Sequence, residues 1–317
     1  MIRFLKNLVP CQNLSGRPMI RVTLALTLCF VCLPLAAQEQ PTRPPITGIA
    51  HVRIYSTDLH KSFDFYSQIL GTAARHAGCT GGLRPCFIVN DQQQILLSEV
   101  VSAPPANLLA EIGFATPDVV RMRDYLLAHN VAAGSVTRDF SGVAHFAVHD
   151  PQGNSIAFVQ FHPRAVFTAP AGQISTRLLH VGFLVEDRAA ADRFYKDILG
   201  FRVYWHGGPK DDETNWVDMQ VPDGTDWIEY MLNPPPNRDH HALGTMNHIA
   251  LGVPDIKAAR EQLQKNGWKS GEEPKVGRGG KWQWNLYDPD DTRVEFMEFT
   301  PVQKPCCSEY SGPHPKP

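Results

Sequence analysis

Short apolar strands, each followed by an aspartate and a helical pattern, recur along the chain. In one such segment, the strand 178–185 is followed by Asp187 and by an amphipathic pattern that runs through Leu199. An aspartate side chain commonly caps the first turn of a helix, so a helix is predicted to begin here. A second segment repeats this arrangement, with the strand 246–253 and a helix that stops before Gly267.

Further strand patterns follow each helix. The segments 215–221 and 226–232 flank residues 222–225, which have the sequence Pro-Asp-Gly-Thr. Such a sequence between two strand patterns is typical of a hairpin. The predicted unit is therefore one strand, one helix and three further strands.

The period of two along a strand assigns side chains to the two faces of a sheet. One face of the strand 178–185 is uniformly apolar and is predicted to pack against the helices: Leu179, Val181, Phe183 and Val185. His180 and Gly182 are predicted to face the other way. In the strand 246–253, His248 lies on the corresponding face, and small neighbours leave room beside each imidazole.

Two glutamates are expected on the same side of the sheet as these histidines. Glu229 shares a strand face with Trp227, and Glu295 lies in a strand that is too apolar for a surface carboxylate. A buried ionised carboxylate costs several kcal/mol unless it is paired or coordinated. Arg293 could pair with Glu295. A divalent cation would satisfy both carboxylates and both imidazoles.

The same pattern occurs twice in the chain. Residues 48–71 can be laid over residues 177–200 without a gap, and His51 then falls on His180. Later, the pair 150–151 falls on 288–289, both Asp-Pro. The chain is therefore predicted to contain a duplicated module.

Four short motifs resemble those of the vicinal oxygen chelate superfamily, which includes glyoxalases, bleomycin-resistance proteins and extradiol dioxygenases. The motifs are Leu178-Leu-His180, Trp227-Ile-Glu229, Asn247-His-Ile-Ala-Leu251, and Asp288-Pro-Asp with Val294-Glu295. They are most similar to bacterial glyoxalase I. The resemblance implies that His180, Glu229, His248 and Glu295 are ligands of one divalent metal, which could be Ni, Co, Zn, Mn or Fe.

The resemblance also implies an α+β fold of two tandem modules. Each module is expected to consist of two βαβββ units that form a curved, partly open, barrel-like sheet. The first module is expected at 46–163, a linker at 164–175 and the metal-binding second module at 176–300. Residues 301–317 are a Pro-rich tail.

The first module departs from the metal-binding pattern. His51 remains, but Glu111 stands where the second module has His248, and Ala157 stands where it has Glu295. The strand near 95–97 offers no obvious counterpart to Glu229. We therefore predict a structural or dimer-mimicking half, and a metal-free ligand pocket is the alternative.

The resemblance implies lyase or isomerase chemistry of the glyoxalase type on a small oxygenated compound, with Glu229 and Glu295 as candidate proton carriers. An extradiol ring-cleaving dioxygenase is an alternative, because a degenerate first module followed by a metal-binding second one is the layout of those enzymes. Their acid-base His is absent from 274–281, and Tyr287 lies too close to the following Asp-Pro for their signature. A protein that sequesters a ligand without transforming it is a third possibility.

Aromatic and basic residues flank the predicted site. Trp216, Trp227 and Trp284 could build an aromatic substrate pocket. Arg278 and Lys281 lie in a Gly-rich segment that could be a lid over an anionic substrate or a solvated hairpin. Three further histidines are expected in surface loops: His206, His240 and His241.

Composition limits the classes of partner. The chain has 317 residues, of which 43% are hydrophobic and 20% charged, enough for about two domains with substantial cores. The formal net charge of -2 provides no basic field for nucleic acid. A small-molecule substrate is the expected partner. Either a monomer or a homodimer is consistent with the duplication, because the modules could pair within one chain.

Residues 1–37 have the pattern of a secretory signal peptide. Arg17 and Arg21 precede an apolar run at 22–37, which ends in two alanines before a polar stretch. The run is shorter than the ~20 residues of a membrane span, so no stable span is expected after cleavage. An uncleaved anchor and a start at Met19 are alternatives. The protein is expected to be exported, to the periplasm or beyond.

Export favours oxidation of cysteine pairs. Cys79 and Cys86 flank a loop that contains two glycines and a proline, and a disulfide between them is predicted, with two unpaired thiols as the alternative. Cys306 and Cys307 have no His at metal-site spacing, so the sequence assigns them no chemistry.

Overall fold

A computed structural model describes residues 41–75, 79–80, 85–139, 142–162, 172–269 and 272–317. The predicted signal peptide and most of the predicted linker lie outside the described residues. Among the helices that are described, none is both long and apolar enough to cross a membrane.

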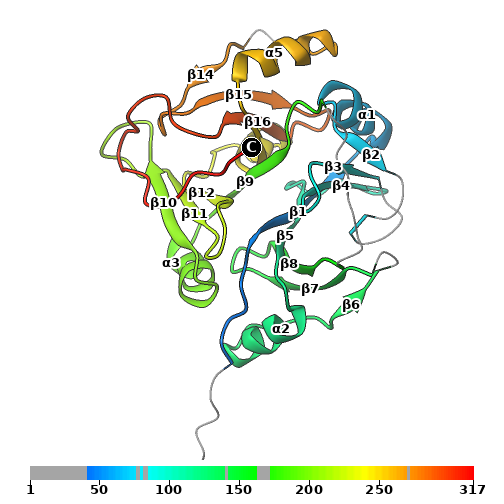
Figure 1. Ribbon diagram of the computed structural model, residues 1–317, viewed down its shortest axis with the longest axis vertical. Helices are drawn as coiled ribbons and strands as arrows, with labels where there is room; N and C mark the ends of the chain where they lie inside the picture. The colour runs from blue at the N-terminus through cyan, green and yellow to red at the C-terminus, as the bar shows by residue number, and fades with distance from the viewer. Residues whose placement is uncertain (1–40, 76–78, 81–84, 140–141, 163–171, 270–271) are drawn as a thin grey trace, which may run out of the picture. The chain divides into compact units, whose positions relative to one another are not determined.

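The first module is a single eight-stranded sheet with helices packed against it (Figure 1). Its first half is β1 (Gly48–Ser56), α1 (Leu59–Asp64), η1 (Phe65–Ile69), β2 (Ala73–Arg75), β3 (Cys86–Ile88) and β4 (Gln94–Glu99). Its second half is β5 (Leu109–Ala115), α2 (Val119–Ala128), β6 (Thr137–Arg138), β7 (Ala144–His149) and β8 (Ser155–Gln160). The strand order is β2-β3-β4-β1-β5-β8-β7-β6, so β1 and β5 join the halves at the centre.

The second module repeats this sheet with the order β10-β11-β12-β9-β13-β16-β15-β14. Its first half is β9 (Arg177–Leu184), α3 (Arg188–Asp192), η2 (Arg193–Ile198), β10 (Arg202–Gly207), β11 (Trp216–Gln220) and β12 (Trp227–Met231). Helix α4 (His240–Met246) precedes the second half, which is β13 (His248–Val253), α5 (Ile256–Lys265), β14 (Lys275–Val276), β15 (Trp282–Tyr287) and β16 (Arg293–Glu298). The predicted α+β fold with two tandem modules is confirmed.

Aspartate caps begin the helices, as the sequence predicts. Asp187 accepts a hydrogen bond from the backbone of Ala190, and Asp255 caps α5 in the same way. The helix that starts at Asp187 widens after one turn into the π-helix η2, and η1 repeats this widening in the first module. The pattern of apolar residues does not predict this change of pitch.

The π-helical turns carry two tyrosines that join the modules reciprocally. Tyr66 of the first module donates a hydrogen bond to Asp288 of the second at 3.1 Å. Tyr195 of the second module donates to Asp150 of the first at 2.9 Å. Both bonds are buried, so each module secures the Asp-Pro turn of the other.

The predicted assignment of side chains to faces is wrong for Leu179. Leu178, Val181 and Phe183 belong to the large core beneath the helices, whereas Leu179 packs on the opposite face beside Trp227. The pairing of β9 with β13 shifts register next to this residue, which interrupts the alternation. His180 nevertheless lies on the face opposite the helices, as predicted.

Candidate metal centre

Four adjacent strands of the second sheet carry the predicted metal ligands. The order β12-β9-β13-β16 supplies, one from each strand, Glu229, His180, His248 and Glu295. In register, Ala250 of β13 pairs with both His180 and Glu295. Gly182 of β9 pairs with both Glu229 and His248. Small residues therefore occupy the positions between the four larger side chains.

The donor atoms of these residues converge. The Nε2 atoms of His180 and His248 are 3.1 Å apart, and Glu229 Oε2 lies 3.1 Å from His248 Nε2. Glu295 Oε2 lies 3.6 Å from His180 Nε2 and 3.8 Å from His248 Nε2. Ligand atoms that share one ion at bond lengths of about 2.1 Å are roughly 3.0 to 3.4 Å apart. The two 3.1 Å spacings lie in this range, whereas the Glu295 spacings and the 3.7 Å between His180 and Glu229 lie above it. The compact group that could hold a cation consists of His180, His248 and Glu295, and Glu229 lies at its edge.

Burial prepares the two imidazoles for coordination. Burial lowers the pKa of His180 and of His248 well below the ordinary value, so both rings are neutral at pH 7. His248 Nδ1 lies 3.0 Å from the carbonyl oxygen of Met246 and can donate to it. In that tautomer the Nε2 lone pair of His248 faces the centre, where it lies 2.8 Å from Arg293 Nη2, so a metal bound at Nε2 would have to displace the guanidinium.

The two glutamates differ in their access to solvent. The side chain of Glu295 is 4% exposed, and burial raises its pKa to about 7. The side chain of Glu229 is 15% exposed. The alternative in which Arg293 neutralises Glu295 directly is not found, because no described ion pair joins them; Arg293 Nη2 instead lies 2.8 Å from His248 Nε2. Arg293 therefore does not neutralise Glu295, and either a proton or a bound cation would balance this carboxylate.

A cavity of about 900 Å³ opens above this centre. Its lining includes His180, Glu229 and Glu295, together with four of the residues that the sequence assigns to the substrate pocket: Trp216, Trp227, Arg278 and Lys281. Lys281 is only 2% exposed, so the segment is not a solvated hairpin at this residue. One face of the cavity thus carries the candidate metal ligands, and another is basic and aromatic.

The prediction that Trp284 lines the pocket is wrong. Trp284 pairs with Phe296, and both belong to the large core beneath the helices. Its indole donates to the backbone oxygen of Glu272 at 3.1 Å. Because the period of β15 is two, Gln283 and Asn285 face the cavity instead.

The prediction that three further histidines lie in loops is also wrong. His206 is on β10, and His240 and His241 open α4, whose N-cap is Asp239. The His241 ring stacks on Tyr287 at a centroid distance of 4.8 Å. None of the three is among the described residues that line the cavity.

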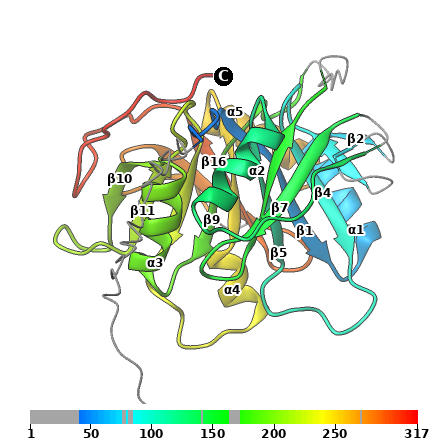
Figure 2. The same cartoon turned by 90° about the horizontal axis from the view of Figure 1, so that it is seen from below.

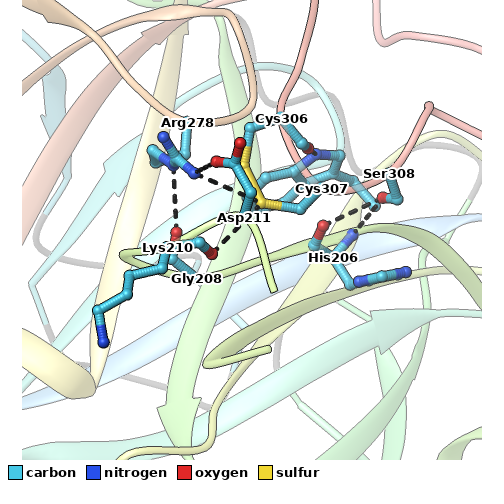
Figure 3. Close-up of a disulfide and its surroundings, with 9 residues drawn as sticks. His206, Gly208, Lys210, Asp211, Arg278, Cys306, Cys307 and Ser308 are labelled. Carbon is cyan, nitrogen blue, oxygen red and sulfur yellow. Dashed lines mark hydrogen bonds and ion pairs between the residues drawn. A yellow bond between two sulfur atoms is a disulfide. The ribbon is translucent and has the colours of Figure 1, made fainter. Parts of the chain in front are cut away.

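The Pro-rich tail forms part of the cavity rim, a role that the sequence does not predict. It runs alongside β10 (Figures 1 and 2), and Ser308 Oγ accepts from the backbone of His206 at 2.9 Å. Cys306 and Cys307 form a disulfide beside Arg278, which also contacts Asp211 (Figure 3). The signal in the sequence for this bond is the adjacency of the two cysteines in a chain for which a secretory leader is predicted.

A second disulfide lies in the first module. Cys79 is joined to Cys86, with their Cα atoms 6.1 Å apart. Cys86 begins β3, and both residues belong to a small cluster with Ile88 and Leu96. The bond therefore links Cys79 to the first residue of β3.

The first module has different residues at all but one of the ligand positions. His51 remains at the position of His180. Ala157 pairs with Gly113 in the first module, just as Glu295 pairs with Ala250 in the second, so Ala157 stands at the position of Glu295. His51 pairs with Gln94 as His180 pairs with Trp227, so Leu96 stands at the position of Glu229. The first module therefore retains one ligand-type histidine without the converging set.

An ion pair occupies that region. His51 Nε2 lies 2.9 Å from Glu111, which is also 3.5 Å from Arg53. Burial lowers the pKa of His51, so its ring is neutral at pH 7 and donates a hydrogen bond to Glu111. Burial alone would raise the pKa of Glu111, but this hydrogen bond and the nearby charge of Arg53 favour the carboxylate, and its pKa is about 2. The carboxylate is thus satisfied by protein groups.

The chain belongs to the glyoxalase/bleomycin resistance protein/dioxygenase superfamily, whose family model matches residues 48–158 and 177–296. Among curated proteins, it is 29% identical over 124 residues to lactoylglutathione lyase of Haemophilus influenzae, a match that covers 38% of this chain and 92% of that protein. It is 28% identical over 135 residues to a probable chloroplastic lactoylglutathione lyase of Arabidopsis thaliana, covering 41% of this chain and 38% of that one.

Solved structures of dioxygenases share the fold. Homoprotocatechuate 2,3-dioxygenase from Brevibacterium fuscum, in complex with 3,4-dihydroxyphenylacetate, has a TM-score of 0.59 and 20% identity, covering 86% of this chain and 85% of that one. The 2,3-dioxygenase LapB from Pseudomonas sp. KL28 has a TM-score of 0.61 and 16% identity, covering 87% and 96%. At these identities the similarity concerns the fold alone.

Proposed function

We propose that the chain is an exported, metal-dependent enzyme that transfers a proton within a small oxygenated carbonyl compound, a lyase or isomerase chemistry of the glyoxalase type. The observation that carries the proposal is the convergence of two neutral imidazoles and two carboxylates beneath a cavity. The similarity of 29% to a lactoylglutathione lyase supports it. Two disulfides support an oxidising compartment.

The residues that would hold the metal are His180, Glu229, His248 and Glu295. A divalent ion bound there would polarise a substrate carbonyl and acidify the neighbouring C–H bond. A set of two nitrogen and two oxygen donors accepts Ni, Co, Zn, Mn or Fe.

Glu229 is the proposed proton carrier. A general base must approach the carbon from which it takes the proton, and Glu229 is the more accessible of the two carboxylates, at 15% against 4% exposure. It also lines the cavity. Glu295, enclosed by the sheet, is the proposed fixed anchor.

Two other functions have less support. An extradiol-type dioxygenase fits the two-module layout, but those enzymes use a separate acid-base histidine. Among the described residues that line the cavity, the histidine is His180, a metal-ligand candidate. A sequestering protein would need a pocket but no converging metal ligands.

The test is deuterium exchange. Metal-loaded protein in D2O is incubated with hydroxyacetone and with thiol adducts of methylglyoxal, and NMR follows exchange at the carbon next to the carbonyl. We expect metal-dependent exchange that falls at least a hundredfold in Glu229→Gln and is unchanged in Glu213→Gln, an exposed control. Oxygen uptake with 3,4-dihydroxyphenylacetate and no exchange would instead establish a dioxygenase. Binding without either reaction would establish a sequestering protein.

A further inference from the structure

Lys281 carries a buried ammonium group that has no hydrogen-bond partner among the described residues. Its side chain lines the cavity above the candidate metal centre and is 2% exposed. Its Nζ atom has no hydrogen-bond acceptor among the described residues. An ammonium group has three N–H donors, and burying them unpaired is costly. A buried lysine without hydrogen-bond acceptors therefore lowers the stability of the fold, so stability does not explain its presence.

Three aromatic rings surround the ammonium. Nζ lies 4.7 Å from the ring centroid of Trp227, 5.1 Å from that of Tyr310 and 5.5 Å from that of Tyr204. Cation–π contacts stabilise the charge, but the ring faces have no lone pairs to accept conventional hydrogen bonds from its N–H groups. The rings therefore hold the charge in place and leave its donors for another group.

The neighbouring carboxylates do not complete the site. Asp218 and Glu295 act on the charge of Lys281, but no described ion pair within 4.0 Å joins either to it. Burial lowers the pKa of Lys281 to about 8, so it is largely charged at pH 7.

The charges of the whole cavity also favour an anion. Apart from Lys304, whose 83% exposed charge is screened by solvent, the described lining holds four cationic side chains, Lys275, Arg278, Lys281 and Arg293. It holds four carboxylates, Asp211, Asp218, Glu229 and Glu295. A divalent metal would add two further positive charges, so the cavity with its metal has a clear excess of positive charge.

The tail completes this site. Tyr310 donates a hydrogen bond to the carbonyl oxygen of Gly279 at 2.8 Å, and Val302 N donates to that of Gly280 at 2.8 Å. The backbone on the N-terminal side of Lys281 is thereby fixed by the tail. The tail lies beyond the residues that match the family model, which end at 296. The aromatic enclosure therefore depends on a segment outside the family domain.

We propose that Lys281 binds a carboxylate of the substrate, so that the substrate is a small organic acid with its reacting oxygenated group at the metal and its carboxylate at Lys281. This assignment rests on the proposed function. Lys281 is the specificity-determining residue, and Tyr204, Trp227 and Tyr310 exclude water from the pair that it forms.

The test compares Lys281→Met with the wild-type protein, both metal-loaded. Calorimetric titration uses benzoate and phenylacetate as probes, and the corresponding amides as neutral controls. Lys304→Met is the matched control, because Lys304 lines the same cavity with an 83% exposed side chain. Metal content and melting temperature are measured for every variant.

We expect Lys281→Met to weaken the binding of both carboxylates at least tenfold, with the amides and the metal content unchanged, and Lys304→Met to change binding less than threefold. Methionine removes the unpaired donors, so its melting temperature should equal or exceed that of the wild type. Equal carboxylate affinity in Lys281→Met, or no carboxylate binding by the wild type, would overturn the proposal. The proposal would also be overturned if Lys281→Met melted at a lower temperature but still bound the carboxylates as tightly as the wild type, because Lys281 would then have a structural role.

These outcomes are separate from a failure of the proposed function. If the wild type held no metal, the metal-dependent reaction would be wrong. The comparison of benzoate affinities would then be made between two metal-free proteins, and the loss in Lys281→Met would still be expected.

Discussion

The imidazole ring of His248 lies directly against Gly182 on the neighbouring strand, and a Cβ at position 182 would overlap that ring. The missing side chain is what allows His248 to cross toward His180. Gly182 thus determines the geometry of the candidate centre without supplying a ligand.

Gly182→Ala is expected to weaken metal binding at least tenfold, because His248 must move to accommodate the methyl group. Metal content after dialysis and the dissociation constant for zinc would measure the effect. The matched control is Gly113→Ala in the first module, where a Cβ would overlap the ring of His51 in the same way. It should affect stability but leave metal content unchanged. Equal metal loss in both variants would contradict this account.

Metal affinity is expected to depend on pH through Glu295. Burial raises the pKa of this carboxyl to about 7 in the metal-free protein, above its ordinary 4.5. A metal must displace the proton below that pH, so affinity should fall about tenfold per unit as pH decreases below 7. The two imidazoles add no proton just below pH 7, because burial lowers their pKa values well below 6.5. An affinity that stays constant from pH 5.5 to 7 would exclude this role.

Glu111→Gln is expected to destabilise the first module without affecting the metal. The folded pKa of Glu111 is about 2, below its ordinary 4.5, so folding favours the ionised form. The stability that this provides is present above pH 4.5 and is lost as pH falls toward 2. Denaturant unfolding should show a loss of about 1 to 3 kcal/mol at pH 7 and almost none near pH 2. If the difference in unfolding free energy between the wild type and Glu111→Gln were the same at pH 7 and near pH 2, the ion-pair assignment would be wrong.

The disulfide between Cys306 and Cys307 is expected to hold the rim. Replacing both cysteines with serine should speed hydrogen exchange in the tail severalfold, including the amide of Cys306 that bonds to the carbonyl of Arg278 at 2.9 Å. Metal content should not change. The double replacement of Cys79 and Cys86 serves as the control and should leave tail exchange as it is. If hydrogen exchange in the tail were unchanged after replacement of Cys306 and Cys307, this disulfide would not stabilise the rim.

The sequence predicts the fold, and it also places the four candidate ligands on one face of the second sheet. Strand alternation, aspartate caps and the internal repeat are local signals, and each also appears in the structure. The alternation fails at Leu179, because a register shift between two strands distant in sequence is not a local property. The pocket assignment of Trp284 fails for another reason. Alternation holds along β15, but which of its two faces meets the cavity is set by its pairing with β16, where Trp284 lies beside Phe296.

The cavity rim could not be predicted in the same way. The tail has no apolar period, and its place is fixed by contacts with β10 and with the segment before Lys281. Lys281 itself is an ordinary charged residue in sequence, and only its enclosure by Tyr204, Trp227 and Tyr310 distinguishes it. Long-range packing creates both features.

The most direct test is the metal content of the chain without residues 1–37, purified without chelator and after reconstitution. The variants are His180→Ala and Glu295→Ala, with His51→Ala of the first module as the matched control. The account predicts close to one divalent ion per chain in the wild type and in His51→Ala, and loss of the ion in the other two. A wild-type protein that holds no ion after reconstitution with Ni, Co, Zn, Mn or Fe would contradict it.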